Sequence, residues 1–128
     1  MMRISSTSWS LLLDESWQDC SEDDLIRLLE PTSQTVLAIS SSRLSDPAYQ
    51  GVLITRNKDT LVEHHFTYEV QQLDSGGCAL LGSDATSVLA YVHHHCTVLM
   101  ITMSSQLVPG PELLAVCRSM IERLEISA

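Results

Sequence analysis

Hydrophobic and polar residues alternate with a period of two along several stretches of the chain, the pattern of half-buried β-strands. The first stretch is residues 8–13, in which Trp9, Leu11 and Leu13 fall on one face. The others are residues 34–42, 61–73, 78–84 and 86–104, the last interrupted by three histidines and a cysteine. From residue 61 onward strand follows strand without a helical pattern between them, which predicts an antiparallel meander.

The C-terminal stretch has the period of an amphipathic helix instead. Gly110 and Pro111 mark its start, and Glu112 lies in its first turn. Leu113, Cys117, Met120 and Leu124 follow at offsets of 0, 4, 7 and 11, which places them on one apolar stripe. We expect this stripe to pack on the sheet, so the chain is predicted to form a single α+β domain over residues 1–128.

A second, short helix is expected on the surface before the meander. Asp46 suits the N-cap position and Pro47 the first helical position, and Tyr49 and Leu53 follow at helical spacing. A glycine and a β-prone run inside the segment oppose this prediction.

Local signals conflict over residues 21–30, SEDDLIRLLE. Ser21 with Asp24 three residues later resembles a capping box, and Pro31 suits the end of a helix. Ten residues are marginal for a helix, however, and the segment lies between two predicted strands. Tertiary packing therefore has room to override the local preference.

Four segments, taken in order, resemble a known arrangement: SWSLLLDESW, VLAISSSR, VLMITMS and a terminal MIERLEIS. Over nearly its whole length the chain is similar to small bacterial proteins of the PsbP/DcrB/Mog-type α+β superfamily, which begin with a strand and a Pro-Glu-Gly-Trp-like turn. Here the turn reads DESW and lacks the Pro and Gly. The resemblance implies that residues 24–30 are a strand and that the terminal helix runs into a short strand. It also implies a binding role, such as adaptor, effector chaperone or immunity-like protein, without a shared catalytic motif.

Composition adds an acidic surface to this picture. Sixteen Asp and Glu against seven Lys and Arg give a formal charge of −9, with seven carboxylates and one Arg between residues 14 and 30. Such a field repels phosphate backbones and anionic lipid, so we expect a basic protein partner, no nucleic acid and no membrane. Glu22, Asp23 and Asp24 are the predicted partner-binding residues, with a role in electrostatic steering. The alternative is that the charge serves solubility alone.

Targeting signals are missing from the sequence. The apolar stretch at residues 11–13 is too short for a signal peptide, and no run has the length of a membrane span, so a cytoplasmic location is expected. Four cysteines lack CxxC spacing and are expected to be small buried hydrophobes in a reducing compartment: Cys20, Cys78, Cys96 and Cys117. An edge strand of the meander offers a route to a homodimer.

The run HHHC, from His93 to Cys96, is the sharpest chemical feature, because imidazole and thiolate are common ligands of zinc and copper. In a strand His93 and His95 project to one face and His94 to the other. His64 or His65 from a neighbouring strand would have to complete a metal site. The alternative is a polar hairpin turn between two apolar runs.

Catalytic signatures are absent: there is no G-x-S-x-G, H-E-x-x-H or glycine-rich phosphate loop. The serines at residues 40–42, followed by Arg43, suit either an anion site or the end of a strand. We therefore expect neither an enzyme nor a cofactor. The primary hypothesis is a non-catalytic protein-binding module, immunity-like or effector-chaperone-like, and the second is a metal-binding protein using His93, His95 and His64.

Overall fold

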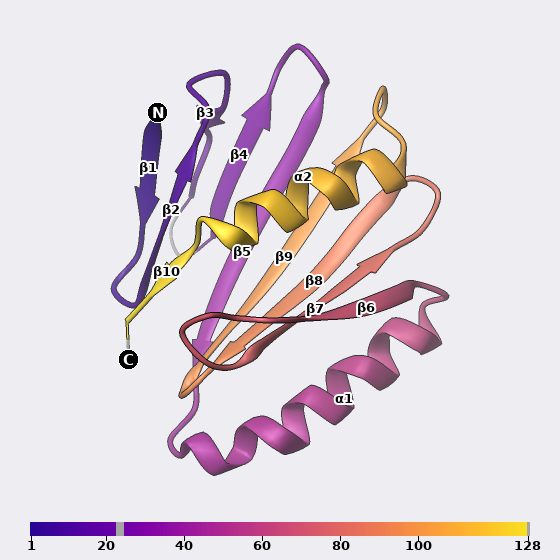
Figure 1. Cartoon of the computed structure of the whole chain (residues 1–128). Coiled ribbons are helices and arrows are strands. Elements are labelled where there is room, and N and C mark those ends of the chain that lie inside the picture. Colours follow the sequence, from indigo (N-terminus) through magenta and orange to yellow (C-terminus); the bar gives the residue numbers. More distant parts are fainter. Residues whose placement is uncertain (23–24, 128) are drawn as a thin grey trace.

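The computed structural model describes residues 1–22 and 25–127, which form two antiparallel sheets and two α-helices (Figure 1). The smaller sheet has the order β1-β2-β10, with β1 (Met2–Ser5), β2 (Trp9–Leu13) and β10 (Glu125–Ile126). The larger has the order β3-β4-β5-β9-β8-β7-β6. Its strands are β3 (Gln18–Asp19), β4 (Ile26–Glu30), β5 (Thr35–Arg43), β6 (Thr67–Gln72), β7 (Cys78–Ser83), β8 (Ser87–His94) and β9 (Thr97–Ser105). The predicted α+β class is confirmed.

Strand β2 follows its sequence pattern closely. Trp9, Leu11 and Leu13 are buried in the main core, whereas the intervening side chains are only half-buried. Trp17, the last residue of the DESW turn, is buried in the same core. The strand predicted at residues 8–13 is therefore confirmed, and β1 is an additional strand that pairs with it.

Strand β4 resolves the conflict over residues 21–30 in favour of the sheet. It pairs antiparallel with β5, in a register that sets Leu28 opposite Leu37. Both leucines are fully buried, and each contributes about 2 kcal/mol by leaving water. The strand predicted for residues 24–30 is confirmed over 26–30, and Asp24 lies outside the described residues.

Helix α2 (Gly110–Glu122) lies across one face of the larger sheet (Figure 1). Leu113, Cys117 and Met120 of the predicted stripe are buried against it, and Leu124 beyond the helix packs at their margin. The chain then enters β10, in the element order that the resemblance implied.

The other helix is longer than expected. A 3₁₀ turn η1 (Pro47–Tyr49), capped by Asp46, leads into α1 (Gln50–Glu63). The strand expected over residues 61–73 is wrong at its start, because 61–63 are helical and β6 begins at Thr67. Leu61 is fully buried against Leu80 and Tyr91. Its burial as part of α1 outweighs the alternating pattern of the residues that follow, so residues 61–63 are helical.

The two faces of the larger sheet are covered unequally. The smaller sheet and α2 cover one face, while α1 lies over β6, β7 and β8 on the other and reaches β9 only at its first residue, Thr97. On that second face Val36 of β5 and Met100 of β9 are exposed. The half formed by β4, β5 and β9 is thus open. None of the described helices has the length and apolarity needed to cross a membrane.

The cysteines only partly match expectation. Cys78 and Cys117 are buried, and burial raises the pKa of both thiols, that of Cys117 to about 12. Cys96 is half-buried and Cys20 is exposed, so the expectation of four buried cysteines is wrong at these two positions.

Candidate functional site

The three histidines lie where β8 turns into β9. His93 and His94 end β8 and are buried, on opposite faces as expected, while His95 is exposed in the turn with φ of 49°. The expected pairing of His93 with His95 on one face is wrong, because the ring of His95 lies against His94 with centroids 4.4 Å apart. The strand ends at His94, so its two-residue period does not extend to His95.

His93 belongs to a chain of hydrogen bonds that joins the sheet to α1. Gln50 Nε2 lies 2.7 Å from the carbonyl oxygen of His95 and 3.0 Å from that of Thr97. Gln50 Oε1 lies 2.8 Å from His93 Nδ1, and His93 Nε2 lies 3.2 Å from Asn57 Nδ2. Gln50 and Asn57 are seven residues apart, which places them two turns apart on one face of the helix.

Two backbone carbonyl groups determine which atom donates and which accepts in each hydrogen bond of this series. Carbonyl oxygens only accept, so Gln50 must present its NH₂ group to them and its Oε1 to His93. His93 Nδ1 therefore carries the proton, and Nε2 accepts from Asn57. Burial lowers the pKa of His93 to about 4, so the ring is neutral at physiological pH.

The predicted metal ligands are not brought together. Both ring nitrogens of His93 are occupied by α1, His95 packs on His94, and His64 is exposed at the C-cap of α1. Within residues 1–22 and 25–127, no three His, Cys, Asp or Glu side chains are grouped so as to hold a metal ion.

Of the three predicted partner-binding residues, the structure describes Glu22, at one edge of the larger sheet. Glu22 is exposed in the turn between β3 and β4, at the edge opposite α1. Asp23 and Asp24 lie outside the described residues. Glu22 is thus accessible, as steering of a partner requires.

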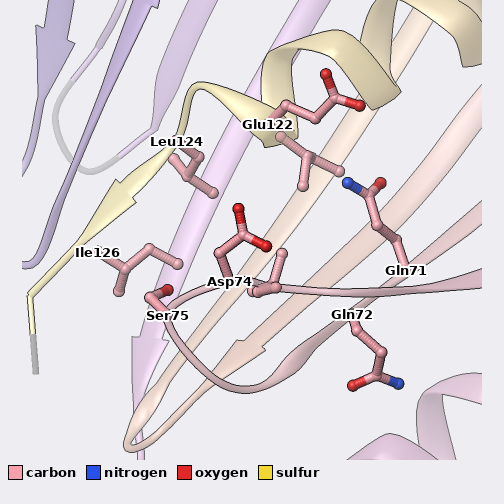
Figure 2. A pocket seen from close by; sticks show the side chains of 9 residues that line it. Gln71, Gln72, Asp74, Ser75, Glu122, Leu124 and Ile126 are labelled. Carbon is pink, nitrogen blue, oxygen red and sulfur yellow. The ribbon is translucent and has the colours of Figure 1, made fainter.

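A cavity of about 480 Å³ opens between the end of α2, β10 and the turn after β6 (Figure 2). We call it the acidic cavity; its walls are Gln71, Gln72, Leu73, Asp74, Ser75, Ile121, Glu122, Leu124 and Ile126. Asp74 rises from the turn into the space below α2, and the Glu122 carboxylate lies at the rim above the Gln71 amide (Figure 2). Four of the nine residues are aliphatic and five are polar or charged, so the two carboxylates stand in a mainly polar cavity with aliphatic side chains in part of its wall.

Neither cavity carboxylate forms an ion pair with another described residue. One turn earlier on α2, by contrast, Arg118 pairs with Glu69 of β6, its Nε lying 3.0 Å from Oε1. Gln71 Oε1, on the cavity wall, is buried and lacks a donor among the described side chains and backbone. We call the line of contact between α2 and β6 the seam. Along it the charged side chain of Arg118 is paired with Glu69, whereas that of Glu122, one turn later, is unpaired among the described residues.

Sequence reasoning missed these groups for different reasons. Asp74 and Glu122 are 48 residues apart, and only the tertiary fold brings their segments together. Gln50 and Asn57 carried a readable signal, since two amides at helical spacing, beside a strand that ends in histidines, suit a buried polar contact.

Comparisons with known proteins show a likeness of fold. No protein-family model and no curated protein matches the chain. Among solved structures it is similar to a crystal structure from Bacteroides thetaiotaomicron VPI-5482 at 1.50 Å resolution, with a TM-score of 0.57 and 12% identity. The match covers 94% of this chain and 45% of that one, so the chain spans less than half of that protein's length. Membership of the PsbP/DcrB/Mog-type superfamily stays a prediction.

Proposed function

We propose that this chain is a non-catalytic protein-binding module whose acidic cavity receives a Lys or Arg side chain of a basic partner. The observation that carries the proposal is the pair of carboxylates, Asp74 and Glu122, without ion-pair partners among the described residues, in a cavity whose wall also includes aliphatic side chains. Opposite charge and apolar surface together are what a long cationic side chain matches.

The shape of such a side chain fits the order of groups in the cavity. Its methylene stem packs along Leu124 and Ile126, while its charged head reaches Asp74 and Glu122. The Arg118–Glu69 pair on the same seam is an example, within this chain, of a guanidinium held by a β6 carboxylate beside α2.

Long-range charge supports the same partner chemistry. A formal charge of −9 attracts a basic surface and raises the rate of encounter. In this proposal Glu22, Asp23 and Asp24 act on the approach of the partner and not on its binding in the cavity. Salt screens the charge of these residues beyond about 8 Å at physiological ionic strength. Binding itself is assigned to the acidic cavity.

A pair of isosteric ligands tests this function. Calorimetry or NMR titration is done with N-acetyl-arginine N-methylamide and with the citrulline compound, which has the same shape without the charge. We expect the arginine compound to bind at least about five-fold more tightly, since one charge-assisted contact contributes about 1 kcal/mol or more.

Charge-matched variants locate the effect. Asp74→Asn combined with Glu122→Gln is expected to remove the preference for arginine. Asp59→Asn combined with Glu112→Gln changes the net charge equally, at exposed positions outside the cavity, and is expected to keep it. Equal binding of both ligands, or a preference that survives in the cavity variant, contradicts the proposal.

A further inference from the structure

A second hollow, of about 260 Å³, lies where α1 meets the open half of the larger sheet. We call it the α1 hollow; it is lined by Ser40, Ser41, Ser42, Leu53, Asn57, Tyr91, Val98 and Met100. It belongs to the sheet face opposite α2 and is separate from the acidic cavity. None of its lining residues is charged at neutral pH, so the hollow offers no ion-pair partner to a charged ligand and suits an uncharged one.

The hydrogen-bond chain through His93 decides what Asn57 offers to this hollow. Asn57 must direct its NH₂ group at His93 Nε2, because that nitrogen only accepts. The Asn57 atom left over is Oδ1, which forms no hydrogen bond with another described residue. Asn57 therefore brings a fixed acceptor to the hollow, and His93 and Gln50 act as positioning residues behind it.

Tyr91 brings the complementary group. Its side chain lines the hollow and is only 8% exposed, yet its hydroxyl forms no hydrogen bond within the part of the chain that the structure describes. Burial raises the pKa of this phenol above its usual value, so the hydroxyl keeps its proton. A protonated phenol is a good donor and calls for an acceptor.

We infer that the α1 hollow binds a primary carboxamide. The amide N–H donates to Asn57 Oδ1 while the amide oxygen accepts from the Tyr91 hydroxyl, so one planar neutral group satisfies both. The aliphatic stem of the ligand lies against Leu53, Val98 and Met100, and the hydroxyls of Ser40 and Ser42 lie at the side of β5. This site is independent of the function proposed for the acidic cavity.

Carboxamides come from two sources, a free small molecule or a Gln or Asn side chain of a polypeptide. One arm of the test titrates ¹⁵N-labelled protein with propionamide and with isosteric propionate. The other uses N-acetyl-glutamine N-methylamide and its glutamate analogue. We expect saturable shifts at the amides of Asn57 and Tyr91 with both carboxamides and none with the acids. A tighter fit for the glutamine compound identifies a polypeptide source, and one for propionamide a small molecule.

Tyr91→Phe keeps the buried ring, removes only the hydroxyl, and is expected to weaken carboxamide binding at least about five-fold, the loss of one hydrogen bond. Tyr68→Phe on β6, outside the hollow, is the matched control and is expected to bind as the parent does. Carboxylates that bind as tightly as carboxamides, shifts confined to other parts of the chain, or an unchanged affinity of Tyr91→Phe would each overturn the inference.

Discussion

His93 Nδ1 donates a 2.8 Å hydrogen bond to Oε1 of Gln50, a residue 43 positions earlier in the chain. This bond fastens the first turn of α1 to the larger sheet, while Leu61, packed on Leu80 and Tyr91, fastens the last turn. The most conspicuous chemical feature of the sequence, its run of histidines, thus includes a residue that holds the fold together. Its neutral ring has consequences for stability that are directly measurable.

Stability is expected to fall as the solution is acidified through the range in which His93 titrates in the unfolded chain. Burial depresses the pKa of His93 from 6.5 to about 4, so between these values the unfolded state binds a proton that the folded state does not. The His93 contribution is intact above pH 6.5 and is lost as the pH falls toward 4. We expect the free energy of unfolding to drop by about 2 kcal/mol between pH 7 and pH 5, measured by urea denaturation.

His93→Gln is expected to abolish this decline, although it lowers stability at pH 7. His64→Gln, at the exposed C-cap of α1, is expected to keep it. A His93 ring that titrates near pH 6.5 by NMR would refute the assignment of a buried neutral imidazole.

Removing the Gln50 amide is expected to destabilise the domain. Gln50→Leu leaves His93 Nδ1 without its acceptor and two backbone carbonyls without their donor. Since an unsatisfied buried group costs about 1 to 3 kcal/mol, we expect a loss of about 3 kcal/mol in denaturant unfolding. The same change at exposed Gln106 serves as control, with an expected effect below about 0.5 kcal/mol. Equal effects at the two sites would count against the hydrogen-bond chain.

Two adjacent glycines in the turn between β6 and β7 are expected to respond differently to alanine. Both have positive φ, but a Cβ on Gly77 meets the His93 carbonyl oxygen at 2.1 Å, whereas a Cβ on Gly76 meets nothing within 4 Å. Gly76→Ala is expected to cost about 1 kcal/mol from backbone strain alone. Gly77→Ala forces the turn away from β8 and is expected to cost about 3 kcal/mol or more. Thermal unfolding of the pair checks this, and indistinguishable melting temperatures would be inconsistent with the contact.

Met120→Asp is expected to prevent soluble folding. Met120 is 2% exposed at the centre of the α2 stripe, and truncating such a side chain already costs about 2 to 5 kcal/mol before a buried carboxylate is added. Domains of this size have only about 5 to 15 kcal/mol of stability. Met120→Leu conserves volume and should cost below about 1.5 kcal/mol. Soluble yield and near-UV circular dichroism distinguish the two, and an aspartate variant that unfolds at the parent temperature would contradict the packing of α2.

Periodicity predicted the elements wherever burial and local pattern agree. Strand β2 and helix α2 follow their apolar repeats because each has one face in the core. The pattern failed at Leu61, where a helix extends into a segment that reads as a strand, since a single buried leucine does not reveal which period it belongs to. The alternating pattern failed again at His95. The backbone of His95 has a positive φ, so β8 ends at His94 and the two-residue period does not continue.

The candidate sites were harder to predict than the elements. Asp74 and Glu122 line one cavity only because the turn after β6 lies near the end of α2, a proximity that no local pattern encodes. The acidic residues that stand out in the sequence instead, represented in the described chain by Glu22, lie at a different edge of the sheet. The sequence shows a negative net charge, on which the proposal of a basic partner rests, but it did not predict that Asp74 and Glu122 line one cavity.

The central claim, that the acidic cavity anchors a cationic side chain, is tested most directly by mapping where such a side chain binds. In a ¹H–¹⁵N correlation titration with N-acetyl-arginine N-methylamide, we predict saturable shifts concentrated at the amides of Asp74, Ser75 and Glu122. Shifts that cluster around Glu22 instead, or that are scattered over all acidic residues without saturation, would contradict it.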